Sequence, residues 1–171
     1  MKEFREITPK DLCASPFEII GNDWLLITAP DETKESGANA MTASWGGLGV
    51  LWNKPVATVY VRPQRYTYHL CENADRFSLC VLPNEYRAAL KVCGTKSGRD
   101  TDKLKECDLT TADIDGVKVI EQSKLAFICK KAYADFIKKD SFIDTDHLKH
   151  YPEDDYHRVY ILEIEKILVK D

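Results

Sequence analysis

The chain has 171 residues, of which 44% are hydrophobic and 30% charged, with a formal net charge of −4. This composition is typical of one soluble globular domain and excludes a disordered chain. The acidic balance argues against nucleic acid or an anionic membrane as a partner. No apolar run approaches the roughly 20 residues that cross a bilayer. Residues 1–9 are polar and lack the apolar core of a signal peptide, so we expect a cytoplasmic protein with a single domain over residues 1–171.

The cysteine pattern predicts reduced thiols. The six cysteines contain no C-x-x-C pair and are scattered at positions 13, 71, 80, 93, 107 and 129. A thiolate metal site needs closely spaced pairs, and a disulfide scaffold is usually smaller and secreted. We therefore expect mostly buried thiols, and we expect Cys93, beside Gly94, to lie in a loop.

The first half of the chain predicts mainly strands. A short helix is expected over Pro9 to Ala14, before Pro16. The apolar run Trp24 to Ala29 predicts a buried strand, and Ala38 to Trp45 predicts a second. The glycines at 46, 47 and 49 predict a loop, after which the β-branched residues of 55–62 predict a strand that stops at Pro63.

The second half alternates short helices with strands. Helical spacing covers residues 66–74, a β-type run covers 77–82, and Pro83 is placed to open a helix that reaches about Val92 and ends at Gly94. A further helical turn or two is expected over 99–107, and late strands over 126–132 and 159–168. Residues 135–156 form a polar insertion. This order favours a mainly β fold, a small β-barrel with flanking short helices, over a parallel α/β sheet.

The first segment that could carry chemistry is NAMTASWGG, Asn39 to Gly47. Thr42 and Ser44 are two residues apart on the expected strand, so both hydroxyls point to one face and Trp45 to the other. Hydroxyls and nearby backbone N–H groups suit a phosphate or a polar ring edge, and the two glycines allow a close approach. The alternative is an ordinary strand with a buried tryptophan.

The second segment is VRPQRYT, Val61 to Thr67. Arg62 and Arg65 stand where a strand leads into a helix, and such arginines can hold a phosphate bidentately. Thr67 adds a hydroxyl near unpaired helix N–H groups. A solvated turn with a capping residue is the alternative.

The third segment is CGTKSGRDTDK, Cys93 to Lys103. Its glycines, hydroxyls and cations suit a loop around an anion, although it lacks the spacing of an ATP-binding P-loop. Lys103 lies four residues after Arg99, on the same face if the segment is helical. The alternative is a surface loop whose charges keep it in water.

The histidines are weak signals by themselves. His147 and His150 lie in the polar insertion among acidic residues that could bind a divalent metal, but solvated side chains are the simpler interpretation, and no metal site is predicted. His157, just before the last strand, is the histidine that we place near a site.

The three segments in this order resemble the flavin reductase-like family, and flavoredoxins most closely. The resemblance covers residues 14–130 and the final strand, and it fails over the insertion 135–156. It implies a Greek-key-like split β-barrel that dimerises and binds FMN near the dimer interface. It further implies that the isoalloxazine and ribityl chain contact Asn39, Met41, Thr42, Ala43, Ser44 and Trp45, and that Arg62, Arg65 and Thr67, which match the family's RPxRxT segment, serve the phosphate. Ser97, Arg99 and Lys103 match its SGRDxDK segment and are expected to bind the cofactor, with Lys103 as a cation at the phosphate or the ring. His157 corresponds in position to a histidine that often precedes the last strand, although here it is embedded in DDYHRV.

The resemblance implies an oxidoreductase, a flavoprotein that uses NADH or NADPH to reduce flavin. A flavoredoxin-like electron carrier that passes electrons to or from a redox protein partner is the first alternative. A small-molecule-binding barrel without redox chemistry is the second. No protein acid or base is needed for hydride transfer to flavin, so no catalytic base is predicted. We expect the insertion 135–156 to act as a lid or a dimer contact.

Overall fold

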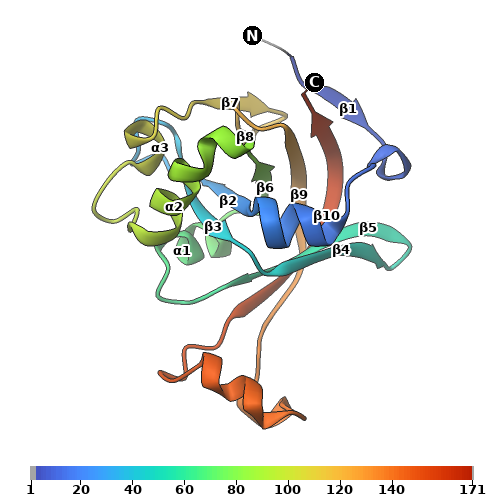
Figure 1. Cartoon of the computed structure of the whole chain (residues 1–171), viewed down its shortest axis with the longest axis vertical. Helices are drawn as coiled ribbons and strands as arrows, with labels where there is room; N and C mark the ends of the chain where they lie inside the picture. Colours follow the sequence, from blue (N-terminus) through green and yellow to red (C-terminus); the bar gives the residue numbers. More distant parts are fainter. Residues whose placement is uncertain (1–2, 171) are drawn as a thin grey trace.

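The computed structural model describes residues 3–170. Most of them form an antiparallel sheet in the order β3-β2-β6-β9-β10-β5-β4, with β1 paired to β10, while β7 and β8 form a separate hairpin (Figure 1). The strands are β1 Arg5–Ile7, β2 Leu25–Pro30, β3 Ala38–Ala43, β4 Gly46–Leu51, β5 Lys54–Val61, β6 Arg76–Val81, β7 Thr111–Ile114, β8 Val117–Ile120, β9 Leu125–Phe136 and β10 Arg158–Val169. The helices are α1 Tyr66–Asn73, α2 Arg87–Thr95 and α3 Lys103–Glu106, with the short helical segments η1 Pro9–Asp11, η2 Glu18–Asp23, η3 Asn84–Tyr86, η4 Lys139–Ser141 and η5 Thr145–His150.

The two edge strands of the sheet, β3 and β4, are neighbours in the chain and are separated only by Ser44 and Trp45. A sheet whose opposite edges are joined by two residues has to curl until those edges meet at one corner. The described residues show no hydrogen-bonded pairing between β3 and β4 that would close the barrel. The mainly β prediction is therefore confirmed, and the curl places the NAMTASW segment at the corner.

The sheet separates two apolar cores, because alternate residues of a strand point to opposite faces. Ile27 of β2 and Phe127 of β9 lie in the core inside the curl. Leu26 and Ala126, one residue before each, lie in a second core under α2, α3 and β8. Strands buried on both faces read as continuous apolar runs, which explains why β2 and β6 were found from sequence.

Several predicted boundaries were wrong. The expected loop at Gly46 to Gly49 is strand β4, paired with β5. The turn between them is Trp52-Asn53, and both residues have positive φ, as a two-residue type I′ hairpin requires. Gly46 lies so close to β5 that a Cβ would stand 2.7 Å from the Thr58 carbonyl oxygen. Close strand approach, rather than loop freedom, explains this glycine.

Two helices differ in their bounds from the predictions. Helix α2 begins at Arg87, after the separate turn η3, and continues through Gly94 to Thr95. Cys93 is therefore fully buried inside a helix and does not lie in a loop. The helix expected over 99–107 is only Lys103–Glu106, so Arg99 and Lys103 do not share a helix face.

Besides β4, three strands were missed: β1, β7 and β8. The β7–β8 turn is Asp115-Gly116, both with positive φ, which is a strong hairpin signal that the prediction overlooked. The polar insertion 135–156 begins in the last two residues of β9 and carries the short helical segments η4 and η5 before β10. In Figure 1 it projects from the body of the molecule, at the end opposite the two termini. No helix in residues 3–170 is long and apolar enough to cross a membrane.

Candidate functional site

The corner between β3 and β4 opens into a hollow of about 250 Å³, which we call the corner pocket. Its walls come from the end of β3, the Ser44-Trp45 link, the end of β5 and the residue before β10. They are Met41, Thr42, Ala43, Ser44, Trp45, Tyr60, Arg62, Arg65 and His157. Trp45 is 47% exposed, so it is an open wall of this pocket and not a core residue.

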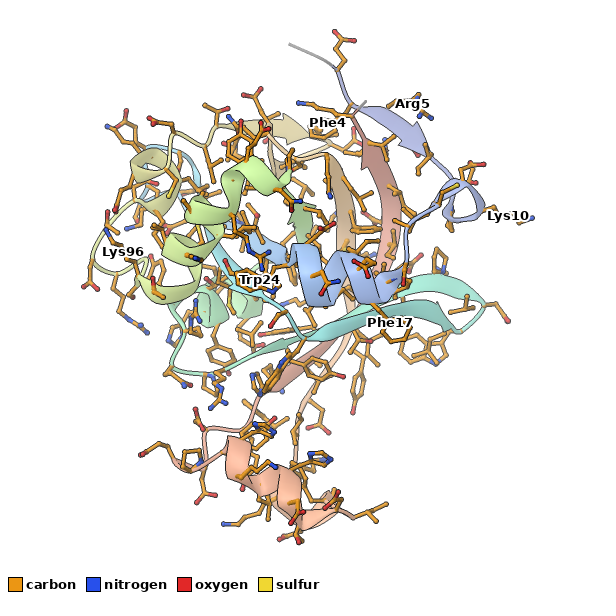
Figure 2. The ribbon with its side chains drawn as sticks, viewed as in Figure 1. Phe4, Arg5, Lys10, Phe17, Trp24 and Lys96 are labelled. Carbon is orange, nitrogen blue, oxygen red and sulfur yellow. The ribbon has the colours of Figure 1, made fainter. Side chains whose placement is uncertain are left out.

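A second hollow of about 190 Å³, the loop pocket, lies beside the first. Arg65 lines both pockets. The other walls are the N-terminal end of α1 and the loop that follows α2, near Lys96 in Figure 2. They are Gln64, Tyr66, Thr67, Gly94, Thr95, Lys96, Ser97, Gly98, Arg99 and Lys103. Cofactor sites usually measure about 300–1,000 Å³. Each pocket by itself is smaller than this, but the two together fall within the range.

Three cations of the loop pocket have no carboxylate partner within the part of the chain that the structure describes. The Lys103 Nζ donates to the Cys93 carbonyl oxygen at 3.3 Å, and Arg65 donates to the same oxygen at 3.2 Å. Arg99 donates to the Gln64 carbonyl oxygen at 3.1 Å. Neighbouring lysines differ: Lys96 pairs with Glu106 and Lys105 pairs with Glu35.

Burial makes the charge on Lys103 costly. The residue is only 2% exposed. Desolvation is the main cause that lowers the pKa of Lys103 to about 8, and the nearby Arg65 lowers it further. Burial also lowers the pKa of Arg65. A bound anion would relieve both effects, because it restores an opposite charge to groups that have lost water.

Polar side chains at the rear of the loop pocket hold its shape. Asn39 is buried and donates from Nδ2 to the Thr67 Oγ1 at 2.7 Å, so it supports the pocket and does not line it. A Cβ on Gly98 would collide with the Asn39 amide and the Tyr66 ring. The Tyr66 hydroxyl donates to Asp31 at 3.0 Å. Only glycine lets the loop lie this close to the start of α1.

The two hydroxyls expected on one face of a strand have different surroundings. The Thr42 hydroxyl donates to the Leu90 carbonyl oxygen of α2, which ties β3 to that helix. Ser44 lies beyond the end of β3 and is exposed. Of the pair, Ser44 is therefore the hydroxyl that remains available at the corner pocket.

Arg62 differs from the other cations. It is in ion-pair contact with Asp155, and its Nη2 donates to the His150 carbonyl oxygen at 2.7 Å. Gln64 donates to the same Asp155 oxygen at 2.7 Å. Arg62 lines the corner pocket and not the loop pocket, and its charge is neutralised by the insertion.

The structure brings the predicted site residues together: all but Asn39 line one of the two pockets. Sequence reasoning missed Tyr60, Tyr66, Tyr151 and Asp155. Tyr60 could have been found, because it shares a strand face with Arg62 two residues later. Tyr151 and Asp155 carried no usable signal, since only the return of the insertion onto the sheet brings them to the pocket.

These pockets fit a planar ring joined to a phosphate. The loop pocket offers three cations that meet no carboxylate among residues 3–170, and the N-terminal end of α1, whose first N–H groups have no partner within the helix. The corner pocket offers apolar and aromatic walls with a few polar groups, which is what a ring needs. A larger hollow of about 500 Å³ lies near Glu35 and Lys105, but there the lysine is already paired with the glutamate. Within residues 3–170, no group of three His, Cys, Asp or Glu side chains is arranged to hold a metal.

Comparison with known proteins points to one family. Residues 20–171 match the model of the flavin reductase like domain. No curated protein matches the chain significantly in sequence.

Three solved structures illustrate the shared fold. An FMN-binding domain of flavin reductases-like enzyme from Shewanella baltica aligns with a TM-score of 0.67 and 14% identity, over 99% of this chain and 78% of that one. The flavoredoxin of Desulfovibrio vulgaris aligns with a TM-score of 0.67 and 20% identity, over 96% and 78%. The styrene monooxygenase flavin reductase of Pseudomonas putida aligns with a TM-score of 0.61 and 13% identity, over 85% and 78%. At these identities the likeness establishes the fold, which matches that of FMN-binding split barrels.

Proposed function

Because this chain belongs to the flavin reductase-like family, we propose that it binds FMN across the two pockets and acts as an NAD(P)H-dependent flavin reductase. The observation that carries the proposal is the cluster of Lys103, Arg65 and Arg99, cations without acidic partners in the described residues, directly beside a pocket walled by Trp45 and Tyr60. FMN has the same two parts, an anionic phosphate and a planar ring. The similar structures include an FMN-binding domain and a flavin reductase.

In this proposal the loop pocket holds the phosphate. Lys103, Arg65 and Arg99 supply charge, and Ser97 and Thr67 line the same space. The ring and ribityl chain lie along Met41 to Trp45 in the corner pocket, with His157 and Tyr60 on the other walls. Asn39 supports Thr67, and Arg62 holds the insertion in place. When bound, the flavin supplies the redox chemistry, and the chain supplies binding, orientation and exclusion of water.

FMN titration of purified protein tests the binding site. Lys103→Ala and Arg65→Ala should each weaken FMN binding by about tenfold to a hundredfold, since a hydrogen bond to a charged group contributes about 1.5–3 kcal/mol. Lys105→Ala is the matched control, because Lys105 lies on the same helix but is exposed and paired with Glu35. Unchanged affinity in both site variants would place the phosphate elsewhere.

Reduction under anaerobic conditions separates the candidate activities. Rapid bleaching of bound flavin by NADH or NADPH supports the reductase. Slow reduction by both nucleotides, with fast reduction by a reduced redox protein, favours an electron carrier like flavoredoxin. The likeness to flavoredoxin structures is the observation that keeps this second function in consideration. Failure to bind FMN at all would favour a barrel that binds another small molecule.

We also propose that the protein is a homodimer. Large apolar side chains are exposed at the β4–β5 turn and beside η2, namely Val50, Trp52 and Phe17. Figure 2 labels Phe17, which directly precedes η2. Large exposed apolar side chains are typical of protein interfaces. None of these three residues lines either pocket.

A further inference from the structure

The polar insertion contributes to the corner pocket, although most of it projects from the body of the molecule (Figure 1). Its last residues, 150–156, return to the end of β5. There the Arg62 guanidinium contacts Asp155 and the His150 carbonyl oxygen, and it lies 5.3 Å from the centre of the Tyr151 ring. Arg62 therefore fastens three neighbouring parts of the insertion to the pocket.

Tyr151 lies against His157, the pocket residue that precedes β10. The Tyr151 hydroxyl and the His157 Nδ1 are 2.9 Å apart, and both side chains are buried. The His157 ring is enclosed by other rings as well, with centroid distances of 5.3 Å to Trp45 and 6.3 Å to Tyr60. Because neighbouring side chains hold the His157 ring on several sides, the orientation of its two nitrogen atoms is fixed.

Hydrogen-bond accounting selects one tautomer of His157. If Nδ1 carried the hydrogen and donated to Tyr151, the buried phenol would have no acceptor for its own hydrogen among the described residues. If Tyr151 donates to Nδ1, the phenol is satisfied and the imidazole hydrogen lies on Nε2. Nε2 has no protein partner in the described chain, and His157 lines the corner pocket. An Nε2–H donor is therefore available to a ligand there.

The charge state of His157 is consistent with this arrangement. Burial, and then the positive charge of Arg62, lower the pKa of His157 to about 4, while Asp155 acts in the opposite direction. The imidazole is thus neutral near pH 7. A neutral ring can hold only one of the two tautomers at a time, so its partner at Nδ1 decides what it offers at Nε2.

We propose that Tyr151 is a positioning residue, which fixes His157 as an Nε2–H donor to a carbonyl acceptor of the planar ring bound in the corner pocket. The identity of that ring as flavin rests on the proposed function. Arg62 contributes indirectly to the orientation of His157, because it holds the segment that carries Tyr151.

Nitrogen-15 NMR of the flavin-free full chain tests the tautomer without any ligand. In the wild type at pH 7, the ring nitrogens of His157 should show a neutral Nε2–H imidazole. In Tyr151→Phe, which keeps the ring but removes the donor, the Nδ1 signal should shift because this nitrogen loses the hydrogen bond that it accepts from the phenol. An Nδ1–H tautomer in the wild type, or an Nδ1 signal that is unchanged in Tyr151→Phe, would overturn the assignment.

A double-mutant cycle tests whether Tyr151 acts through His157. Tyr151→Phe should weaken FMN binding about three- to tenfold, the value of one ordinary hydrogen bond. The same change made in a His157→Gln background should alter affinity less than about twofold, because no imidazole remains to be oriented. An equal loss in both backgrounds would show that Tyr151 acts only through packing, and would overturn the proposal.

Lys139→Gln is the control from within the insertion, since it breaks the exposed Lys139–Asp154 ion pair away from the pocket. It should leave FMN affinity unchanged. If the wild type binds no FMN, the ring-donor role fails together with the proposed function. A wrong tautomer with normal FMN binding would instead overturn the Tyr151 inference alone.

Discussion

The buried Lys103 should make the FMN affinity of the loop pocket depend on pH. Its lowered pKa, about 8, means that the flavin-free protein begins to lose this charge just above neutral pH. A bound phosphate would favour the charged form and raise the pKa again. Binding should then take up a proton above pH 8, and affinity for FMN should fall as pH rises from about 8 to about 9, approaching tenfold per unit. Lys103→Ala should remove most of that dependence. Isothermal titration in buffers of different ionisation enthalpy measures both quantities, and a flat profile in the wild type would contradict the assignment.

The lowered pKa of His157 should affect the stability of the fold. Its pKa is about 4 in the folded chain, against about 6.5 when unfolded. Between these values the unfolded state binds a proton that the folded state does not. The free energy of unfolding should therefore rise with pH from about 4 to about 6.5. Arg62 and Asp155 are the charged groups that act on this ring. His157→Gln should reduce the slope in urea unfolding measured across this range, and an identical slope would indicate that other groups cause it.

In strand β4, the close approach of β5 should make Gly46 more important for stability than Gly49. Glycines suggested a loop, yet Gly46 is needed because β5 passes close to its Cα. Gly46→Ala should lower the free energy of unfolding by about 1–3 kcal/mol, the usual cost of overpacking. Gly49, on the same strand, has open space around the position of a Cβ. Gly49→Ala should change stability by less than about 1 kcal/mol. Urea unfolding of both variants checks the pair, and equal losses would mean that strand approach is not the reason for Gly46.

For the whole molecule, the proposed dimer depends on the apolar surface at Val50, Trp52 and Phe17. Replacing Val50 and Trp52 by aspartate should convert a dimer into a folded monomer, because charges are strongly disfavoured at the core of an interface. Light scattering and far-UV circular dichroism measure mass and fold together. Ile143→Ser is the matched control, since Ile143 is likewise an exposed large apolar residue but lies in the insertion. Loss of the dimer in that variant instead would move the interface to the insertion.

The mainly β fold and the family could be predicted from the sequence, because both depend on local patterns. Strands buried on two faces appear as continuous apolar runs, so β2 and β6 were recognised. Short edge elements such as β1 and β4 were not. β1 pairs with β10, which is distant in the chain, whereas β4 forms a hairpin with the adjacent β5 but carries three glycines that favour a loop. The motif order indicated the flavin reductase-like family, and the family match over residues 20–171 confirmed it.

The amino-acid order by itself determined which residues are available: the cations of residues 62–103, the tryptophan at 45 and the histidine at 157. Only the tertiary structure decided which of these cations are neutralised by a carboxylate and which are not. Asp155 neutralises Arg62, whereas Lys103, Arg65 and Arg99 meet no acid in the described residues. The physical reason is that pairing and desolvation depend on which side chains meet in space. The curl of the sheet and the return of the insertion bring those groups together across as many as 93 residues of chain.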